Sequence, residues 1–305
     1  MKILVTGASG RIGERLVHWL ETKTSYDLIL TSRRQPKFDC QRSVWIQGDL
    51  RNIEDLNRIF SYEPDVVIHL AAAVGAKNSA SIESYEAIEL MPTIRLLDYI
   101  LNKQLAVKFI FASSGGTVYQ DGKAEHIETE RIECSSLYSC NKIYVENLLW
   151  LYKKSLHPII LRISNPFGMT INPNINQGII DIAVNCAKTN QIFSVWGNVS
   201  NIRDFIHIDD LCAAFMKVIN FSSSEFEIFN IGSGIGVSIS EIIACIKRYS
   251  PGFKYEIIRN EHCGDISSNI LNISKARSLL NWQPTIPVET YLRGIFQKRE
   301  VGAIA

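Results

Sequence analysis

Short apolar runs alternate with segments of helical periodicity through the first half of the chain. The runs are rich in β-branched residues and cover 3–5, 28–30, 44–46, 66–68, 109–111 and 159–163. Between them, apolar residues recur every three or four positions at 12–20, 53–60, 84–101 and 138–152. Continuous apolar strands separated by helices are typical of a parallel sheet that is covered on both faces. The pattern therefore predicts an α/β fold built on a doubly wound parallel sheet.

The second half of the chain is less regular. The segment 172–176 has the composition of an irregular loop, and no internal repeat is visible. We expect residues 1–165 to form the sheet domain, with residues 200–232 returning to it. Residues 166–199 and 233–305 are expected to form a smaller substrate-binding lobe, which closes over the strand ends where ligands bind in such sheets.

Composition narrows the class of protein. Of the 305 residues, 46% are apolar and 21% are charged, which is typical of folded globular proteins. The 32 basic and 31 acidic side chains nearly cancel, which argues against binding to nucleic acid or to an anionic membrane. Seven scattered cysteines without a C-x-x-C pair argue against a metal site or a disulfide framework. No apolar run reaches the ~20 residues of a membrane span, so we expect a cytoplasmic protein.

A glycine-rich turn follows the first predicted strand and precedes the first helix. Gly7 permits the tight turn, Gly10 lets the backbone approach a pyrophosphate, and Gly13 lets the helix pack closely on the strand. The free N–H groups and the positive end of the helix then bind the phosphates. This context predicts a Rossmann-like dinucleotide site. Its expected contacts in the turn are Gly7, Ser9, Gly10, Arg11, Ile12 and Gly13.

The ends of the next strands indicate which dinucleotide binds. An acidic residue about 20 residues after the turn would bind the ribose of NAD, but the second strand ends in Ser32, Arg33 and Arg34. Ser32 and Arg33 are suited to a 2′-phosphate, which favours NADP. A solvated basic loop is the alternative, and NAD then remains open. Further cofactor contacts are expected from Asp49, placed to bind the adenine amino group, and from Leu50, Leu70, Ala71 and Ala72.

Tyr138 and Lys142 lie one turn apart on one face of a predicted helix. A tyrosine in water has a pKa near ~10 and is a poor base at neutral pH. A neighbouring ammonium favours the phenolate form. The same lysine can also hold the nicotinamide ribose. The pair therefore predicts a proton-transfer site beside the cofactor.

Taken together, these motifs resemble the extended short-chain dehydrogenases/reductases, specifically the nucleotide-sugar epimerase/dehydratase group. The resemblance rests on the glycine turn, on Tyr138-x-x-x-Lys142 and on the segment 113–119, and it covers essentially the whole chain. Later matches are found at 165–168, 203–210, 229–234 and 282–284. The resemblance implies that Tyr138 exchanges a proton with a sugar hydroxyl or ketone while the nicotinamide exchanges a hydride with the same carbon.

The segment 113–119 departs from the family pattern at one position. In the family a serine or threonine normally bonds the reacting oxygen, and its position falls on Gly115. Thr117, slightly favoured, or Ser114 must then supply this hydrogen bond. Dehydratases of the family carry an Asp-Glu pair where this chain has Gly116 and Thr117. Because water elimination needs a general acid and a base, we expect no dehydratase activity.

The resemblance also implies contacts to the substrate. Asn165 is expected to face the nucleotide diphosphate, and Arg203 to bind its phosphates. His262 stands where a second arginine is usual, with Arg259 as an alternative. Glu89 stands where the family has an asparagine. The strand-end histidines His69 and His207 are expected to be structural.

These observations lead to an enzyme that acts on an NDP-hexose. The first hypothesis is a 4-epimerase. It is favoured by the residue pattern of segment 115–119 and by the close match of the second half of the chain to the family. The alternative is an NADPH-dependent reductase of an NDP-4-keto-6-deoxyhexose, which the basic residues at 32–34 favour. A non-enzymatic NADP-sensing regulator is a third hypothesis, although such proteins typically lose the tyrosine or the lysine. By resemblance we also expect a homodimer through the helices 84–101 and 138–152, and a role in polysaccharide biosynthesis.

Overall fold

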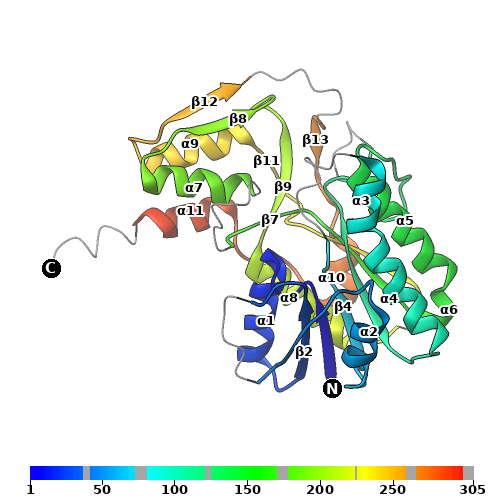
Figure 1. Ribbon diagram of the computed structural model, residues 1–305. Helices are drawn as coiled ribbons and strands as arrows, with labels where there is room; N and C mark the ends of the chain where they lie inside the picture. Colours follow the sequence, from blue (N-terminus) through cyan, green and yellow to red (C-terminus); the bar gives the residue numbers. More distant parts are fainter. Residues whose placement is uncertain are drawn as a thin grey trace.

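A seven-stranded parallel sheet forms the centre of the computed structural model, in the order β10-β6-β5-β4-β1-β2-β3 (Figure 1). The structure describes residues 1–36, 42–72, 81–120, 125–169, 178–223, 225–258 and 266–297. The sheet strands are β1 (Lys2–Thr6), β2 (Asp27–Ser32), β3 (Val44–Gln47), β4 (Val66–His69), β5 (Lys108–Ser114), β6 (Ile159–Ile163) and β10 (Glu227–Ile231). The predicted α/β fold with a parallel sheet is confirmed.

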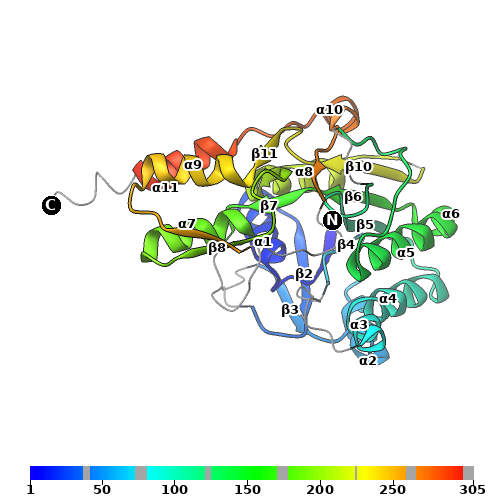
Figure 2. The same cartoon turned by 90° about the horizontal axis from the view of Figure 1, so that it is seen from above.

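Helices cover both faces of this sheet (Figure 2). One face packs against α1 (Arg11–Lys23), α8 (Ile208–Asn220) and α10 (Ser274–Leu280). The other packs against α2 (Ile53–Phe60), α4 (Met91–Asn102), α5 (Leu137–Leu151) and the short α6 (Lys153–Leu156). Because alternate residues of a strand point to opposite faces, Ile3 and Val5 join the first core and Leu4 joins the second. This double burial is why the strands read as continuous apolar runs.

The segment 84–101, which the periodicity predicts to be one helix, forms two. These are α3 (Ile82–Glu89) and α4, and Pro92 stands in the first turn of α4. Proline has no N–H to continue the hydrogen-bond ladder of α3, and it is well tolerated at the start of a new helix. The prediction of a single long helix was therefore wrong. The helix predicted at 138–152 is present as α5, which a capping box at Ser136 begins.

A further group of elements stands beyond the carboxyl ends of the sheet strands (Figure 1). Strand β9 pairs with β7, β11 and β13, and β8 pairs with β12. Helices α7, α9 and α11 enclose a third apolar core. The bounds are β7 (Asn165–Phe167), α7 (Ile179–Thr189), β8 (Phe193–Trp196), β9 (Ile202–His207), β11 (Gly236–Ser238), α9 (Ile239–Tyr249), β12 (Tyr255–Ile258), β13 (Ser268–Asn269) and α11 (Val288–Gln297). We call the part built on the third core the lobe.

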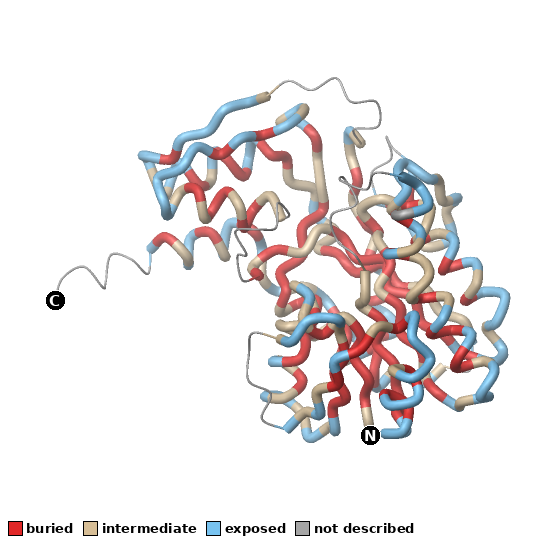
Figure 3. Tube along the Cα trace, viewed as in Figure 1, coloured by how far each residue is buried: buried red, intermediate tan, exposed pale blue. Residues whose placement is uncertain are grey.

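The buried residues gather along the central sheet and between the helices of the lobe (Figure 3). The domain boundaries that the sequence suggests at 165, 199 and 232 stay a prediction. Among the described residues, no helix is both long enough and apolar enough to cross a membrane.

Candidate active site

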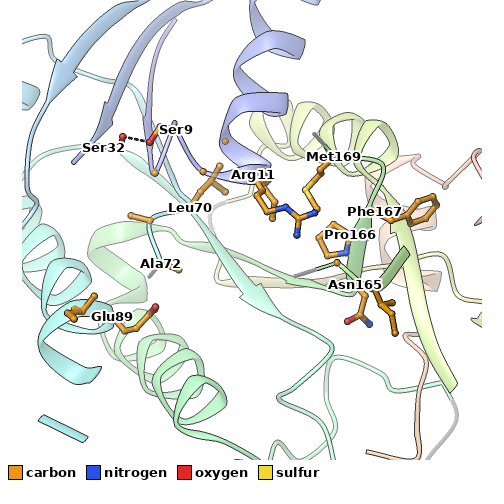
Figure 4. Close-up of a pocket in the computed structure, with 18 of the residues that line it drawn as sticks. Ser9, Arg11, Ser32, Leu70, Ala72, Glu89, Asn165, Pro166, Phe167 and Met169 are labelled. Atoms are coloured by element: carbon orange, nitrogen blue, oxygen red, sulfur yellow. Dashed lines mark hydrogen bonds between the residues drawn. The ribbon is translucent and has the colours of Figure 1, made fainter. Parts of the chain in front are cut away.

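A pocket of about 750 Å³ lies between the ends of the sheet strands and the lobe (Figure 4). This volume is in the usual range for small-molecule sites. Residues of 7–13, 31–34, 48–50 and 70–72 form its sheet side, and residues of 165–169, 178–180 and 195–203 line its lobe side. The structure thus brings together all the predicted cofactor contacts except Tyr138 and Lys142, which line an adjoining pocket.

The glycine turn forms a tight backbone cradle at the start of α1. Gly7 has a positive φ of 70°, and a Cβ on it would meet the backbone N of Ala71 at 2.7 Å. A Cβ on Gly13 would meet the carbonyl oxygen of Gly7 at 2.3 Å. Gly10 occupies the N-cap position and has no side chain to bond the first N–H groups of the helix. The geometry fits the tight turn assigned to Gly7 and the close packing assigned to Gly13, and the approach of Gly10 to a pyrophosphate stays a prediction.

Basic and hydroxyl groups line the outer end of the pocket. The hydroxyls of Ser9 and Ser32 lie 2.6 Å apart, and Ser32 donates to the carbonyl of Arg34 at 2.6 Å. Asp49 also lines this end, and Arg51 binds its carboxylate through Nε and Nη2. The hydrogen bond from Arg51 lowers the pKa of Asp49, so that this carboxylate stays an acceptor at neutral pH.

Tyr138 and Lys142 lie on α5 at the inner end of the site. They line a small pocket that shares Ala71 and Glu89 with the large one. Lys142 is buried, and its Nζ donates to the carbonyl of Ala112 at 2.9 Å. The same Nζ lies 5.5 Å from the centre of the Tyr138 ring. The one-turn spacing therefore places the ammonium beside the phenol, as the sequence predicts.

The candidate hydroxyls Ser114 and Thr117 lie at the end of β5. Thr117 Oγ1 donates to Ser114 Oγ at 2.9 Å, and neither residue lines the two pockets described above. A Cβ on Gly115 would meet Leu271 Cδ1 at 2.6 Å and the carbonyl oxygen of Arg162 at 2.9 Å. The close approach of these two groups explains why no side chain occupies the position.

The predicted substrate contacts lie on the lobe side of the large pocket. Asn165 Nδ2 donates to the carbonyl of Asp204 at 2.9 Å, which orients its side chain. Arg203 lines the same wall from β9. Glu89 is buried where the two pockets meet. His262 and its alternative Arg259 lie outside the described residues.

The two strand-end histidines have structural surroundings. His69 is buried between Thr6 Oγ1 and Thr93 Oγ1, each 2.8 Å from a ring nitrogen. Burial, with a smaller contribution from the charge of Lys142, lowers the pKa of His69 to about 3. His207 accepts a hydrogen bond from the backbone N–H of Asp209 at the start of α8.

Sequence reasoning missed a buried charge network behind the Tyr138–Lys142 helix. Glu146, one turn after Lys142, pairs with Arg162 on β6 at 2.7 Å. Glu146 also accepts a hydrogen bond from Ser113 on β5, and Arg162 donates to the hydroxyl of Tyr119 at 3.0 Å. A carboxylate at i+4 from the lysine was the available signal, but the strand that supplies its partner is visible only in the fold.

Sequence reasoning also missed an ion pair between the glycine turn and the lobe. Arg11, in the glycine turn, pairs with Asp181 on α7 at 2.8 Å. The two residues are 170 positions apart, and no local pattern connects them.

The chain is similar in sequence and fold to known proteins. Residues 3–232 match the NAD dependent epimerase/dehydratase family. The chain is 31% identical to a protein of Methanocaldococcus jannaschii named putative UDP-glucose 4-epimerase, over 96% of each. It is 29% identical to a dTDP-4-dehydro-6-deoxyglucose reductase of Escherichia coli, over 94% of each. The crystal structure of UDP-glucuronic acid 4-epimerase from Bacillus cereus, in complex with UDP-glucuronic acid and NAD, superposes with a TM-score of 0.86 at 25% identity over 99% of each chain.

The resemblance that the sequence motifs suggest is therefore confirmed, and the chain belongs to the NAD dependent epimerase/dehydratase family.

Proposed function

We propose that the protein is a nucleotide-sugar 4-epimerase, which inverts C4 of an NDP-hexose through a transient oxidation. The observation that carries the proposal is the arrangement around the large pocket. It joins a glycine cradle for a dinucleotide, the Tyr138–Lys142 pair in the adjoining pocket, and Asn165 with Arg203 on the lobe side. The names of the relatives from M. jannaschii and B. cereus support the same class of reaction.

The cradle fits a nicotinamide dinucleotide, which when bound supplies reversible hydride exchange at C4 of its ring. Gly7 and Gly13 let the backbone pack tightly at the start of α1, where a pyrophosphate is best stabilised. Ser32 and Arg33 support NADP through contacts with a 2′-phosphate. NAD is the alternative, and the structure of the B. cereus relative contains it.

Tyr138 holds the proton that leaves the sugar hydroxyl and returns to it. Lys142 keeps a positive charge beside the phenol, and the carbonyl of Ala112 holds its Nζ in place. Because Thr117 donates a hydrogen bond to Ser114 Oγ, the hydroxyl hydrogen of Ser114 is free to bond the sugar oxygen. We therefore propose Ser114 as the hydrogen-bond donor, with Thr117 orienting it.

The substrate is proposed to be a nucleoside-diphosphate sugar with its diphosphate in the lobe. Arg203 supplies positive charge, Asn165 supplies an amide, and His262 or Arg259 is proposed as the second contact. Guanidinium groups suit phosphates because they donate two parallel hydrogen bonds. The names of the relatives point to a uridine or thymidine nucleotide.

A 4-ketoreductase is the second candidate. Arg33 and Arg34 at the outer end of the pocket favour NADPH as a consumed reductant, and the E. coli relative is named as such a reductase. In this reaction Tyr138 would donate its proton to the ketone once per turnover and would be reprotonated from water.

We also propose that two chains associate through α3 and α5. Apolar side chains are exposed on both helices, at Ile82 and Ile88 of α3 and at Leu137, Tyr144 and Leu151 of α5. The seven-residue spacing places Leu137, Tyr144 and Leu151 along one face of α5. An exposed apolar stripe of this kind is typical of an interaction surface. A cytoplasmic location and a role in polysaccharide biosynthesis complete the proposal.

The first test identifies the cofactor and the reaction. The protein is purified without added cofactor and denatured, and any released nucleotide is identified by mass spectrometry. Stoichiometric NAD, together with interconversion of UDP-glucose and UDP-galactose, supports the epimerase and contradicts the 2′-phosphate role of Arg33. An empty site that binds NADPH more tightly than NADH, together with reduction of a dTDP-4-keto-6-deoxyhexose, supports the reductase instead.

The Tyr138→Phe variant tests the assignment of the acid–base group. We expect kcat to fall roughly 10²- to 10⁴-fold with binding of UDP-sugar retained, because a positioned proton donor contributes about that factor. Tyr144→Phe, a change on the exposed face of the same helix, should leave kcat unchanged. Full turnover by Tyr138→Phe would contradict the proposal. Biological activity that survives this variant without turnover would favour the cofactor-sensing regulator.

A further inference from the structure

The ion pair between Arg11 and Asp181 joins the glycine turn to the lobe. Arg11 is the first residue of α1, and Asp181 is the third residue of α7. The guanidinium lies on the wall of the large pocket near Pro166 and Met169 (Figure 4). The exposed fraction of the side chain is 15% for Arg11 and 2% for Asp181. The contact is therefore largely shielded from water.

Asp181 connects two segments of the lobe to this guanidinium. Its carboxylate accepts hydrogen bonds from the backbone N–H groups of Gly168 at 2.8 Å and Met169 at 3.4 Å, directly after β7. A Cβ on Gly178, just before α7, would meet Arg11 Nη2 at 2.8 Å. The end of β7 and the start of α7 thus both pack around one side chain of the dinucleotide turn.

Such a contact holds its partners in a defined geometry. Burial raises the pKa of Asp181 while the backbone N–H of Gly168 and the charge of Arg11 lower it, so the carboxylate depends on these partners to stay ionised. Breaking a buried pair by removing one member leaves an uncompensated charge, which is strongly unfavourable. When Arg11 is ordered, it therefore favours one position of α7, and of the residues directly after β7, relative to the glycine turn.

The two parts of the chain that this ion pair joins are both binding surfaces in the proposed function. This inference rests on that function. The backbone of Arg11 belongs to the cradle for the dinucleotide pyrophosphate, and Asn165 to Phe167 and Gly178 to Ile180 line the lobe side of the same pocket. A ligand that orders the glycine turn also orders Arg11, and through Asp181 it orders the start of α7.

We propose that Arg11 and Asp181 are positioning residues that couple the two halves of the pocket. A dinucleotide on the glycine turn strengthens the binding of a nucleoside diphosphate in the lobe through this pair. Coupling of binding free energies is reciprocal, so the nucleoside diphosphate strengthens dinucleotide binding by the same factor.

The test measures the affinity for UDP by calorimetry, with and without saturating NAD⁺ or NADP⁺, in the whole protein. In the wild type we expect the dinucleotide to tighten UDP binding by about fivefold or more. In Arg11→Gln this ratio should fall to about one, and in Arg11→Lys, which keeps the charge, it should be partly restored. The substitution is made at Arg11 rather than at Asp181 because Arg11→Gln leaves the hydrogen bond between Asp181 and Gly168 in place.

Arg15→Gln is the matched control. Arg15 lies one turn further along α1 and pairs with Asp209 on α8 at 2.7 Å, away from the lobe. We expect this variant to keep the wild-type ratio. A wild-type ratio in Arg11→Gln, or an equal loss in Arg15→Gln, would overturn the proposal.

A second readout does not depend on the nucleotide sugar. Hydrogen exchange of the amides in 179–189 is measured with and without the dinucleotide. We expect the dinucleotide to slow exchange there in the wild type and in Arg15→Gln but not in Arg11→Gln. If the wild type fails to bind UDP, the proposed substrate class is wrong, and the exchange measurement still decides the coupling: a slowing that survives in Arg11→Gln, or no slowing in the wild type, rules it out.

Discussion

At the scale of single residues, Gly115 shows how packing selects the residue at a position where the family resemblance leads us to expect a hydroxyl group. The family resemblance places a hydroxyl-bearing side chain here, yet Leu271 and the backbone of β6 fill the space. The neighbouring pair Ser114 and Thr117 then offers the nearest hydroxyls, bonded to each other. The local sequence predicts the two candidate hydroxyls. The contact with Leu271 explains why residue 115 is a glycine.

Gly115→Ala should destabilise the protein. Because the added methyl would overlap Leu271 and a carbonyl oxygen, we expect the free energy of unfolding to fall by roughly 1–3 kcal/mol. The measurement is urea unfolding. Gly116→Ala is the control, since a Cβ there would meet nothing closer than 3.6 Å. Equal effects of the two substitutions would contradict this account of Gly115.

The burial of His69 should make the protein sensitive to acid. Its pKa is about 3 in the folded protein, against an ordinary value of 6.5. Between about pH 3 and pH 6.5 the unfolded chain therefore binds up to one more proton than the folded protein. The stability that neutral His69 contributes is present above pH 6.5 and is lost as the pH falls toward 3, at up to ~1.4 kcal/mol per pH unit.

Urea unfolding at pH 7.5 and pH 5.5 tests this dependence. We expect His69→Gln to be less stable than the wild type at pH 7.5, because it loses its contacts with Thr6 and Thr93. It should also lose less stability on acidification. His18→Gln, at an exposed position of α1, should keep the wild-type slope, and an unchanged slope in His69→Gln would refute the assignment.

At the scale of elements, one charge network attaches α5, the helix that carries Tyr138 and Lys142, to the sheet. Lys142 bonds the carbonyl of Ala112, and Glu146 bonds the hydroxyl of Ser113, so successive residues of β5 hold successive turns of α5. Arg162 connects β6 to the same carboxylate. The network therefore fixes the strand that carries Ser114 relative to the helix that carries Tyr138.

Arg162→Met should leave Glu146 as an uncompensated buried charge. We expect a loss of about 3–5 kcal/mol in the free energy of unfolding, measured in urea at pH 7.5. The double variant Arg162→Met with Glu146→Met removes both charges and should regain most of this loss. A double variant no more stable than Arg162→Met would show that the hydrogen bonds, rather than the unpaired charge, dominate.

At the scale of the whole molecule, the large pocket exists because two parts of the chain meet. The sheet ends supply the cradle for a dinucleotide, and the lobe supplies Asn165 and Arg203. The exposed apolar stripe lies on α5, at Leu137, Tyr144 and Leu151, and Figure 1 shows this helix at the edge of the molecule beside α4. Helix α5 therefore contributes to the candidate site through Tyr138 and Lys142, and to the proposed self-association through this stripe.

The stripe predicts the effect of a charge placed on it. Tyr144→Glu should dissociate the proposed dimer, because burying a carboxylate in an apolar contact is costly. Light scattering should show the mass of two chains for the wild type and of one for the variant. Ile53→Glu, at an exposed apolar position on α2, should leave the mass unchanged. A wild type that scatters as one chain would refute the dimer itself.

The sequence by itself determined the features that depend on short-range geometry. Strand and helix periods predicted the parallel sheet, because burial on both faces imposes continuous apolar runs. The glycines of 7–13 lie in one turn between a strand and a helix, and Tyr138 and Lys142 lie one helical turn apart. Both patterns were therefore visible without the fold. The same short-range view failed at Pro92, where periodicity continued across a break between two helices.

Only the tertiary structure decided the features that join distant residues. Leu271 closes the space beside Gly115, Arg162 pairs with Glu146, and Asp181 pairs with Arg11. Each contact joins residues of different elements, and neither periodicity nor spacing shows which elements meet. The physical reason is that burial and charge pairing depend on which surfaces meet, and the packing of the lobe on the sheet sets that.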